Sequence, residues 1–177
     1  MLYSWPSEGS VPSYTVDEEN VAWSRPRFAL FLTMLRDRLG TNTVHILAHS
    51  MGSRLVAETM ASLVSTADPH AARLRQLVFA APDINAAIFN DLAALFQDKA
   101  ERVTLYASSE DLPLKAYRGV HRYARAVESG LDLLIVNVID TIDATAVDTG
   151  FLGHSYYGDN RSVLADLFEL NQNECAG

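Results

Sequence analysis

The amino-acid sequence predicts an α/β fold of three layers, in which a doubly wound, mostly parallel sheet is covered by helices on both faces. Several apolar runs are typical of buried strands, and amphipathic stretches of helical length follow them. Continuous apolar strands indicate a parallel sheet, whose right-handed crossover helices cover its faces. We therefore expect the 177 residues to form a single domain, 1–177.

Two elements are expected before the main strands. The segment Leu2–Trp5 predicts a short strand, which Pro6 and Gly9 end. The segment Val16–Leu39 carries large apolar side chains at helical spacing and predicts a helix. Pro26 either kinks this helix or marks its true start.

Four apolar runs predict the main strands. They are VHILA (44–48), QLVFAAP (76–82), RVTLYAS (102–108) and LDLLIVNVID (131–140). Helices are expected after them at 51–64, 85–96, 114–127 and 162–170. The second of these is expected to turn one side to the sheet with Ile88, Leu92, Leu95 and Phe96. Functional residues of parallel α/β sheets gather at the carboxyl ends of strands, so the residues that follow these strands are the site candidates.

Composition and charge argue against several classes of function. With 49% hydrophobic and 20% charged residues, the chain is expected to be globular. Its formal net charge of −8 argues against nucleic acid and anionic membranes as partners, because both bind basic surfaces. No apolar stretch approaches the roughly 20 residues of a membrane span, and the N-terminus lacks signal-peptide features. A lone Cys175 cannot form an internal disulfide, so a cytoplasmic location is the default expectation.

The stretch VHILAHSMGSRL (44–55) carries the strongest chemical signal. Ser50 lies between an expected strand and an expected helix, with the small residues Ala48 and Gly52 on either side. This pattern predicts a nucleophile elbow, whose strained turn presents the serine hydroxyl and packs closely against its neighbours through the small residues. The Met51 N–H at the helix start is then expected to stabilise an oxyanion. The alternative is that Ser50 only caps the helix, although a cap does not need small neighbours.

A nucleophilic serine needs a histidine base, and in this kind of site the order along the chain is serine, acid, histidine. His154 is the predicted base, because it follows the last strand in a glycine-rich loop that can return over the elbow. His45 and His49 are expected to be packing residues, and His70 and His121 lie in surface-like segments.

Three aspartates are candidates for the orienting acid. Asp111 ends YASSED (106–111), after the second strand beyond the elbow, and is the expected acid. Asp83 follows the strand before it, and Asp140 ends the strand after it, so both remain alternatives. Asp83 directly precedes a helix and also fits a helix cap.

These motifs resemble the α/β-hydrolase superfamily. The resemblance rests on SWPS (4–7), ILAHSMGSRL (46–55), AAPDI (80–84), YASSED (106–111) and GHSYY (153–157), and it looks most like a bacterial branch of lipase- and esterase-like serine hydrolases. It implies Ser50 as nucleophile, His154 as general base and acid, Asp111 as orienting acid and Met51 N–H as oxyanion donor. We therefore expect hydrolysis of a small-molecule carboxylic ester through an acyl-enzyme, with no metal or organic cofactor.

The chain departs from that branch at its start. Members usually begin with additional strands, and a His-Gly motif after the third strand supplies a second oxyanion donor, whereas no such segment precedes Leu2. The expectation is an N-terminally truncated fold whose activity alone is weak, since losing one oxyanion donor costs about 10²–10³ in kcat. The alternative function is a binding or assembly domain, with a homo-oligomer or a partner strand completing the sheet.

Overall fold

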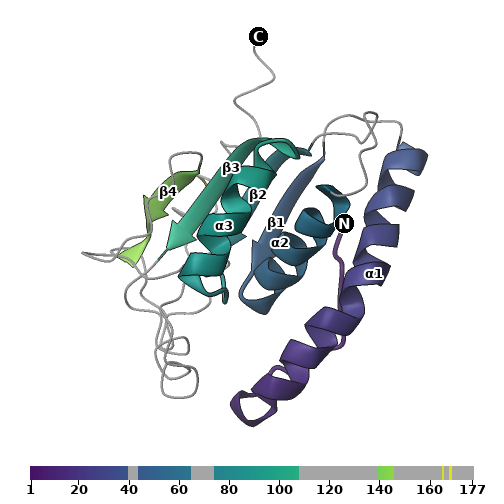
Figure 1. The fold of residues 1–177 in the computed structure, drawn as a ribbon, viewed down its shortest axis with the longest axis vertical. Helices are drawn as coiled ribbons and strands as arrows, with labels where there is room; N and C mark the ends of the chain where they lie inside the picture. The colour runs from purple at the N-terminus through teal and green to yellow at the C-terminus, as the bar shows by residue number, and fades with distance from the viewer. Residues whose placement is uncertain (40–43, 65–73, 108–138, 146–164, 166–167, 169–177) are drawn as a thin grey trace.

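The described part of the chain is built on a parallel four-stranded sheet. The structure is a computed structural model and describes residues 1–39, 44–64, 74–107, 139–145, 165 and 168. The strands are β1 (His45–His49), β2 (Leu74–Ala80), β3 (Ala100–Ala107) and β4 (Asp140–Asp143), in the spatial order β1-β2-β3-β4 (Figure 1). Every pairing between neighbours is parallel, which confirms the predicted α/β class.

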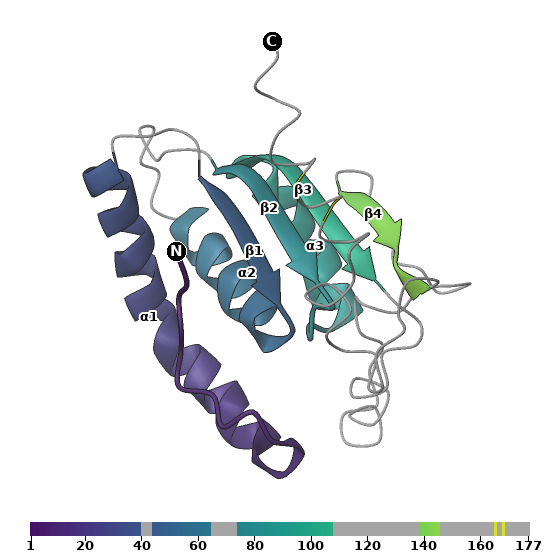
Figure 2. The ribbon, with the colours of Figure 1, turned by 180° about the vertical axis from the view of Figure 1, so that it is seen from behind.

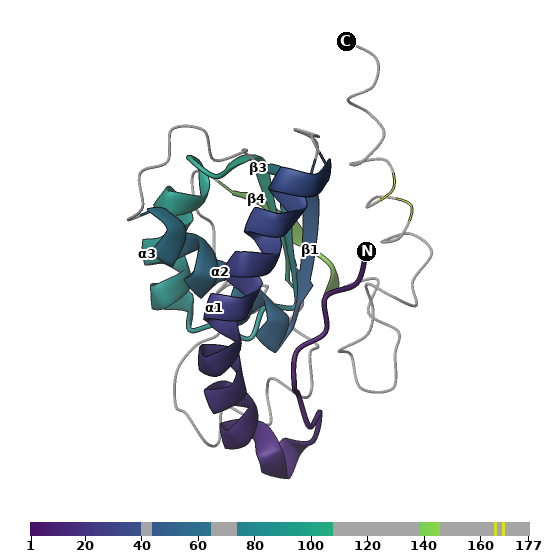
Figure 3. The same cartoon turned by 90° about the vertical axis from the view of Figure 1, so that its right-hand side faces the viewer.

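The described helices lie on one face of this sheet. A short 3-10 helix, η1 (Val11–Ser13), leads into α1 (Tyr14–Leu39), and α2 (Met51–Val64) and α3 (Ala86–Phe96) follow β1 and β2. Figure 3 shows α1, α2 and α3 on the same side of the strands. Right-handed crossovers between strands that succeed one another across a sheet place their helices on one face, as seen for α2 and α3. The predicted helix at 114–127 lies outside the described residues, and Ala165 and Phe168, within the predicted helix at 162–170, are both helical.

The core lies between the sheet and these helices. Leu77, Phe79 and Leu105 of the strands are fully buried, as are Phe89 and Phe96 of α3. The ring centroid of Phe79 lies 5.2 Å from that of Phe89 and 5.3 Å from that of Phe96. Burying an apolar side chain of this size contributes about 1.5–3 kcal/mol, so this cluster fixes α3 on the sheet.

The buried side of α3 agrees only in part with the predicted one. The helix buries the predicted Phe96 together with Phe89 and Ala93, whereas the predicted Ile88 is 51% exposed. Both sides have helical spacing, and the larger aromatic area of Phe89 accounts for the difference. Asn85, predicted as the first helical residue, is the N-cap, because its Oδ1 accepts hydrogen bonds from the Ala87 and Ile88 amides.

Helix α1 passes through Pro26 rather than starting there. It begins at Tyr14, two residues before the predicted start, and ends at Leu39 as predicted. Proline lacks the N–H for an intrahelical bond and crowds the preceding turn, and Figure 2 shows the helix bent along its length. The buried side chains of Val21 and Phe28, on either side of Pro26, hold both halves against the core.

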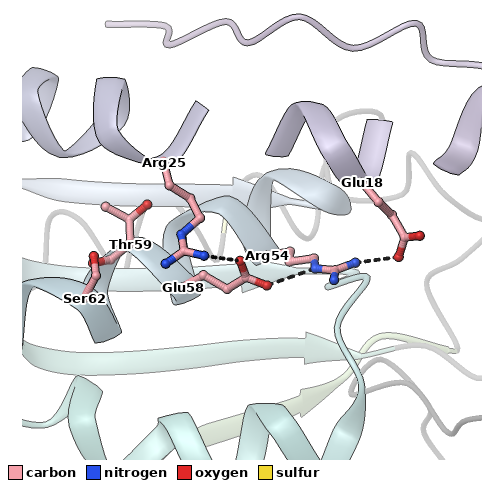
Figure 4. A network of polar contacts seen from close by, with 6 residues as sticks. All are labelled: Glu18, Arg25, Arg54, Glu58, Thr59 and Ser62. Atoms are coloured by element: carbon pink, nitrogen blue, oxygen red, sulfur yellow. Dashed lines mark hydrogen bonds and ion pairs between the residues drawn. The ribbon is translucent and has the colours of Figure 1, made fainter. Parts of the chain in front are cut away.

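Charged side chains join α1 to α2 (Figure 4). Arg54 of α2 donates from Nη1 to Glu18 Oε1 at 2.6 Å and from Nε to Glu58 Oε1 at 3.0 Å. Arg25 of α1 donates to the other oxygen of Glu58 at 3.3 Å. Burial alone lowers the pKa of Arg54, but the hydrogen bonds and charges of Glu18 and Glu58 outweigh it and raise that pKa. Arg54 therefore stays charged and holds the first half of α1 beside the start of α2.

The predicted strand at Leu2–Trp5 is wrong. Residues 1–9 form no strand, and the ring of Tyr3 packs on α1, with centroids 4.8 Å from Phe28 and 4.9 Å from Phe31. A strand needs a neighbouring strand for its backbone groups, and this segment instead follows α1 through aromatic contacts.

A buried carboxylate fixes the loop that precedes α1. Asp17, only 4% exposed, accepts hydrogen bonds from Ser7 Oγ at 2.9 Å, from the Glu8 amide at 2.8 Å and from the Gly9 amide at 3.2 Å. Hydrogen bonds to an ionised carboxylate are strong, so the first turn of α1 determines the path of residues 7–9.

An apolar groove runs along β1, one of the two edge strands of the described sheet. It has a volume of about 490 Å³ and is lined by residues 1–3 and Trp5, by α1, by all of β1 and by the first half of α2. Leu47, in the middle of β1, is 50% exposed. The described residues therefore leave the outer edge of β1 beside an open apolar surface.

Candidate active site

Ser50 lies at the junction of β1 and α2, where the chain turns sharply. Its φ is +50°, a left-handed value that costs a residue with a side chain about 1–2 kcal/mol. A serine that only caps a helix takes an extended-region backbone conformation. The strained value is instead the one expected of a nucleophile elbow.

Backbone hydrogen bonds hold Ser50 in this conformation. Its amide donates to Ala80 O at 3.1 Å, which ties the turn to the end of β2. Its carbonyl accepts from the Ser53 amide at 3.0 Å and from the Asp83 amide at 3.2 Å. Strained residues persist where the surrounding structure over-determines them, and these three bonds supply such support.

A second left-handed residue, Ala81, directly follows the neighbouring strand β2. Its φ is +46°, and its amide donates to Tyr106 O at 3.1 Å, which extends the β2–β3 ladder. The chain then turns so that the Asp83 amide reaches Ser50 O. Two adjacent strands therefore end in strained turns at the carboxyl edge of the sheet, where sites of parallel α/β proteins form.

Met51 is the first residue of α2. The first N–H groups of an α-helix have no intrahelical acceptor and lie at the positive end of the helix dipole. The Met51 amide is therefore chemically suited to stabilise negative charge that develops beside Ser50.

The two small residues near Ser50 differ in their surroundings. Ala48 is buried in β1, as a closely packed elbow requires. A Cβ added at Gly52 would meet nothing within 4 Å, so the expectation that Gly52 must be small for packing is wrong for the described residues. Gly52 lines the groove beside β1, and that open space is the reason.

Asp83 lies beside the elbow and is buried, with 1% of its surface exposed. Its Oδ2 accepts a hydrogen bond from the Tyr14 hydroxyl at 2.6 Å. The helix-cap alternative for Asp83 is wrong, because Asn85 caps α3. Tyr14 was missed by sequence reasoning, since it lies just before the predicted helix and belongs to no motif.

Comparison with known proteins agrees with this geometry. Residues 1–170 match the family described as Alpha/beta hydrolase of unknown function (DUF900). The chain belongs to this alpha/beta hydrolase family. An uncharacterised protein of Nostoc sp. is 35% identical over 65 residues, which are 37% of this chain and 17% of the Nostoc protein. No solved structure matches the chain.

Asp140 was predicted to end a strand, but it is the first residue of β4, which runs to Asp143. Asp140 is paired in register with Thr104 of β3. It therefore lies three residues, or about 10 Å, before the carboxyl end of β4 at Asp143. Its carboxylate is 57% exposed as a side chain and accepts a 2.7 Å hydrogen bond from Arg102 Nε. These contacts engage the Asp140 carboxylate in an ion pair with Arg102.

Asp111 and His154, the predicted acid and base, lie outside the described residues. Of the other histidines, His49 is half-buried at the end of β1. His45 is exposed, so its expected packing role is wrong, because β1 is an edge strand of the described sheet.

Within the described ranges, no group of three or more histidine, cysteine, aspartate or glutamate side chains is placed to hold a metal ion. None of the helices in the described part of the chain is long and apolar enough to cross a membrane.

Proposed function

We propose that the chain is an esterase- or lipase-like serine hydrolase of carboxylic esters. The observation that carries this proposal is the left-handed backbone of Ser50 at the strand-to-helix junction. A helix-capping serine has no need of that strain, whereas a nucleophile uses it to present its hydroxyl above the sheet.

The proposed reaction has two halves. Ser50 Oγ attacks the ester carbonyl carbon while His154 takes the hydroxyl proton, and Asp111 orients and stabilises the imidazolium. The tetrahedral oxyanion accepts a hydrogen bond from the Met51 amide. It collapses as His154 protonates the leaving alcohol, which gives an acyl-enzyme. His154 then deprotonates a water molecule, which attacks the acyl carbon, and the acid leaves with Ser50 restored.

Hydrolysis of p-nitrophenyl esters tests the roles of these residues. Ser50→Ala and His154→Ala are expected to abolish the enzymatic rate, and Asp111→Asn to lower kcat by up to about 10⁴. Asp140→Asn is the matched control, because Asp140 is an exposed, ion-paired aspartate and its substitution should change kcat by less than about twofold. Hydrolysis that survives Ser50→Ala, or equal effects of the two aspartate substitutions, would contradict the proposal.

Among the described residues no strand pairs with the outer edge of β1, and this favours a second candidate function, as an assembly domain that pairs with an extended strand. A free strand edge presents a row of backbone N–H and C=O groups, which another strand matches and a small molecule does not. The groove beside this edge is lined mainly by apolar side chains, and Gly52 leaves room for a backbone to approach. A second copy of the chain supplies such a strand, because each copy carries the same edge.

The mass of the chain in solution tests this second candidate. Assembly through β1 predicts a dimer that Leu47→Lys returns to a monomer, because a lysine on an edge strand opposes pairing. Leu30→Lys is the control, since Leu30 is also exposed (65%) but lies on α1, and it should leave the dimer intact. A monomer with full ester hydrolysis would exclude the need for a partner strand.

A further inference from the structure

Asp83 connects the start of α1 to the backbone of Ser50. The Tyr14 hydroxyl donates to Asp83 Oδ2 at 2.6 Å, and the Asp83 amide donates to Ser50 O at 3.2 Å. Tyr14 is 6% exposed and Asp83 1% exposed. A buried side-chain hydrogen bond therefore links residues 69 positions apart in the sequence directly behind the elbow.

This contact is suited to fixing a strained turn. A hydrogen bond from a hydroxyl to a carboxylate is short and strong when the carboxylate is ionised. The loop that it fixes contains Ala81, with φ of +46°, and contacts Ser50, with φ of +50°. Such backbone values persist only where neighbouring contacts hold them, so a looser Asp83 loop would let the Ser50 hydroxyl shift.

We propose that Tyr14 and Asp83 are positioning residues for the Ser50 hydroxyl. Tyr14 holds the Asp83 side chain, and the Asp83 amide holds the carbonyl of the nucleophile in place. This inference rests on the proposed function of Ser50. It assigns Asp83 a role through the backbone, distinct from that of an acid that orients the histidine.

Tyr14→Phe tests the hydroxyl alone, since the ring is kept. Small misplacements of reacting groups reduce the rate strongly, so kcat for a p-nitrophenyl ester is expected to fall about 10- to 100-fold with KM changed less than about twofold. Leu74→Ala is the control for lost stability, because Leu74 is buried at the first residue of β2, at the other end of that strand from Ala80 and the elbow. It should lower the melting temperature without lowering kcat. An unchanged kcat in Tyr14→Phe would overturn the inference.

Substitutions of Asp83 separate positioning from acid catalysis. Asp83→Asn keeps an oxygen that accepts the Tyr14 hydrogen bond, so it should lose less kcat than Asp83→Ala. If Asp83 were instead the acid that orients the histidine, Asp83→Asn alone would cost about 10⁴ in kcat. That outcome would replace the proposed role.

Amide hydrogen exchange gives a readout that does not depend on activity. In Tyr14→Phe the Ser50 and Asp83 amides should exchange about tenfold faster, while Val78 in the middle of β2 should not change. Unchanged exchange at Ser50 and Asp83 would overturn the inference whether or not the chain hydrolyses esters. Absence of Ser50-dependent hydrolysis in the wild type would count against the proposed function alone.

Discussion

Ser50→Gly is expected to be more stable than Ser50→Ala, although glycine is the more flexible residue. Both substitutions remove the hydroxyl, so their difference reports the backbone. Alanine at φ of +50° keeps the left-handed penalty of about 1–2 kcal/mol, which glycine does not have. The greater conformational freedom of glycine in the unfolded chain reduces this advantage of glycine by about 0.4–1 kcal/mol. Glycine is therefore favoured by about 0.5–1 kcal/mol, or about 1–4 °C in melting temperature for a chain of this size.

Ser62 provides the matched control for this comparison. It lies in α2 with an ordinary helical backbone, where glycine is about 0.8–1 kcal/mol less favourable than alanine. Urea unfolding of the four variants should therefore give opposite signs at the two positions. The reasoning about the elbow would be refuted if Ser50→Gly were less stable than Ser50→Ala, as at position 62.

Three further predictions concern the rest of the described fold. Ala81→Gly should change the free energy of unfolding by less than about 1 kcal/mol, because relief of the left-handed strain offsets the lost methyl group, whereas Ala57→Gly, fully buried in α2, should lose about 2 kcal/mol. Arg54→Met should lose about 1–2 kcal/mol in urea unfolding because it leaves two partly buried glutamates without this partner, and Arg25→Met less than about 1 kcal/mol. Because the pKa of Arg54 is raised, its charge stabilises the fold at every pH below its strongly basic range and is lost only above it. The difference between wild type and Arg54→Met should therefore be equal at pH 7 and pH 9, and a decrease at pH 9 would contradict the raised pKa.

The sequence predicts the elements with strong periodicity and misses features set by tertiary contacts. Helix α2 spans the predicted residues 51–64, and the left-handed backbone of Ser50 follows from the strand-to-helix setting of the elbow. The Leu2–Trp5 strand is wrong because strand pairing depends on a neighbour that four residues of local sequence cannot reveal. Periodicity alone also allows two apolar sides for α3, and packing against Phe79 selects the one with Phe89.

The site shows the same division. Ser50 is carried by a local motif, so its position could be predicted, whereas the Tyr14–Asp83 contact joins residues 69 apart and has no local pattern. Asp140 was misplaced because β4 begins at Asp140 and runs to Asp143, and an aspartate after an apolar run gives no sign of its pairing with Arg102. The open space at Gly52 belongs to the groove beside β1. Its presence depends on which segments pack beside β1, and the local sequence around Gly52 does not determine that.

Covalent labelling of Ser50 tests the central claim most directly. A fluorophosphonate reacts with an activated serine, so intact mass and peptide mapping of the folded wild-type chain should show one adduct, on Ser50. The same reagent should give no adduct with Ser50→Ala, and none at Ser50 after the wild-type chain is unfolded in urea, because the elbow and its base are then dispersed. A folded wild-type chain that remains unlabelled, or that is labelled as fully as Ser50→Ala, would contradict the assignment of Ser50 as the nucleophile.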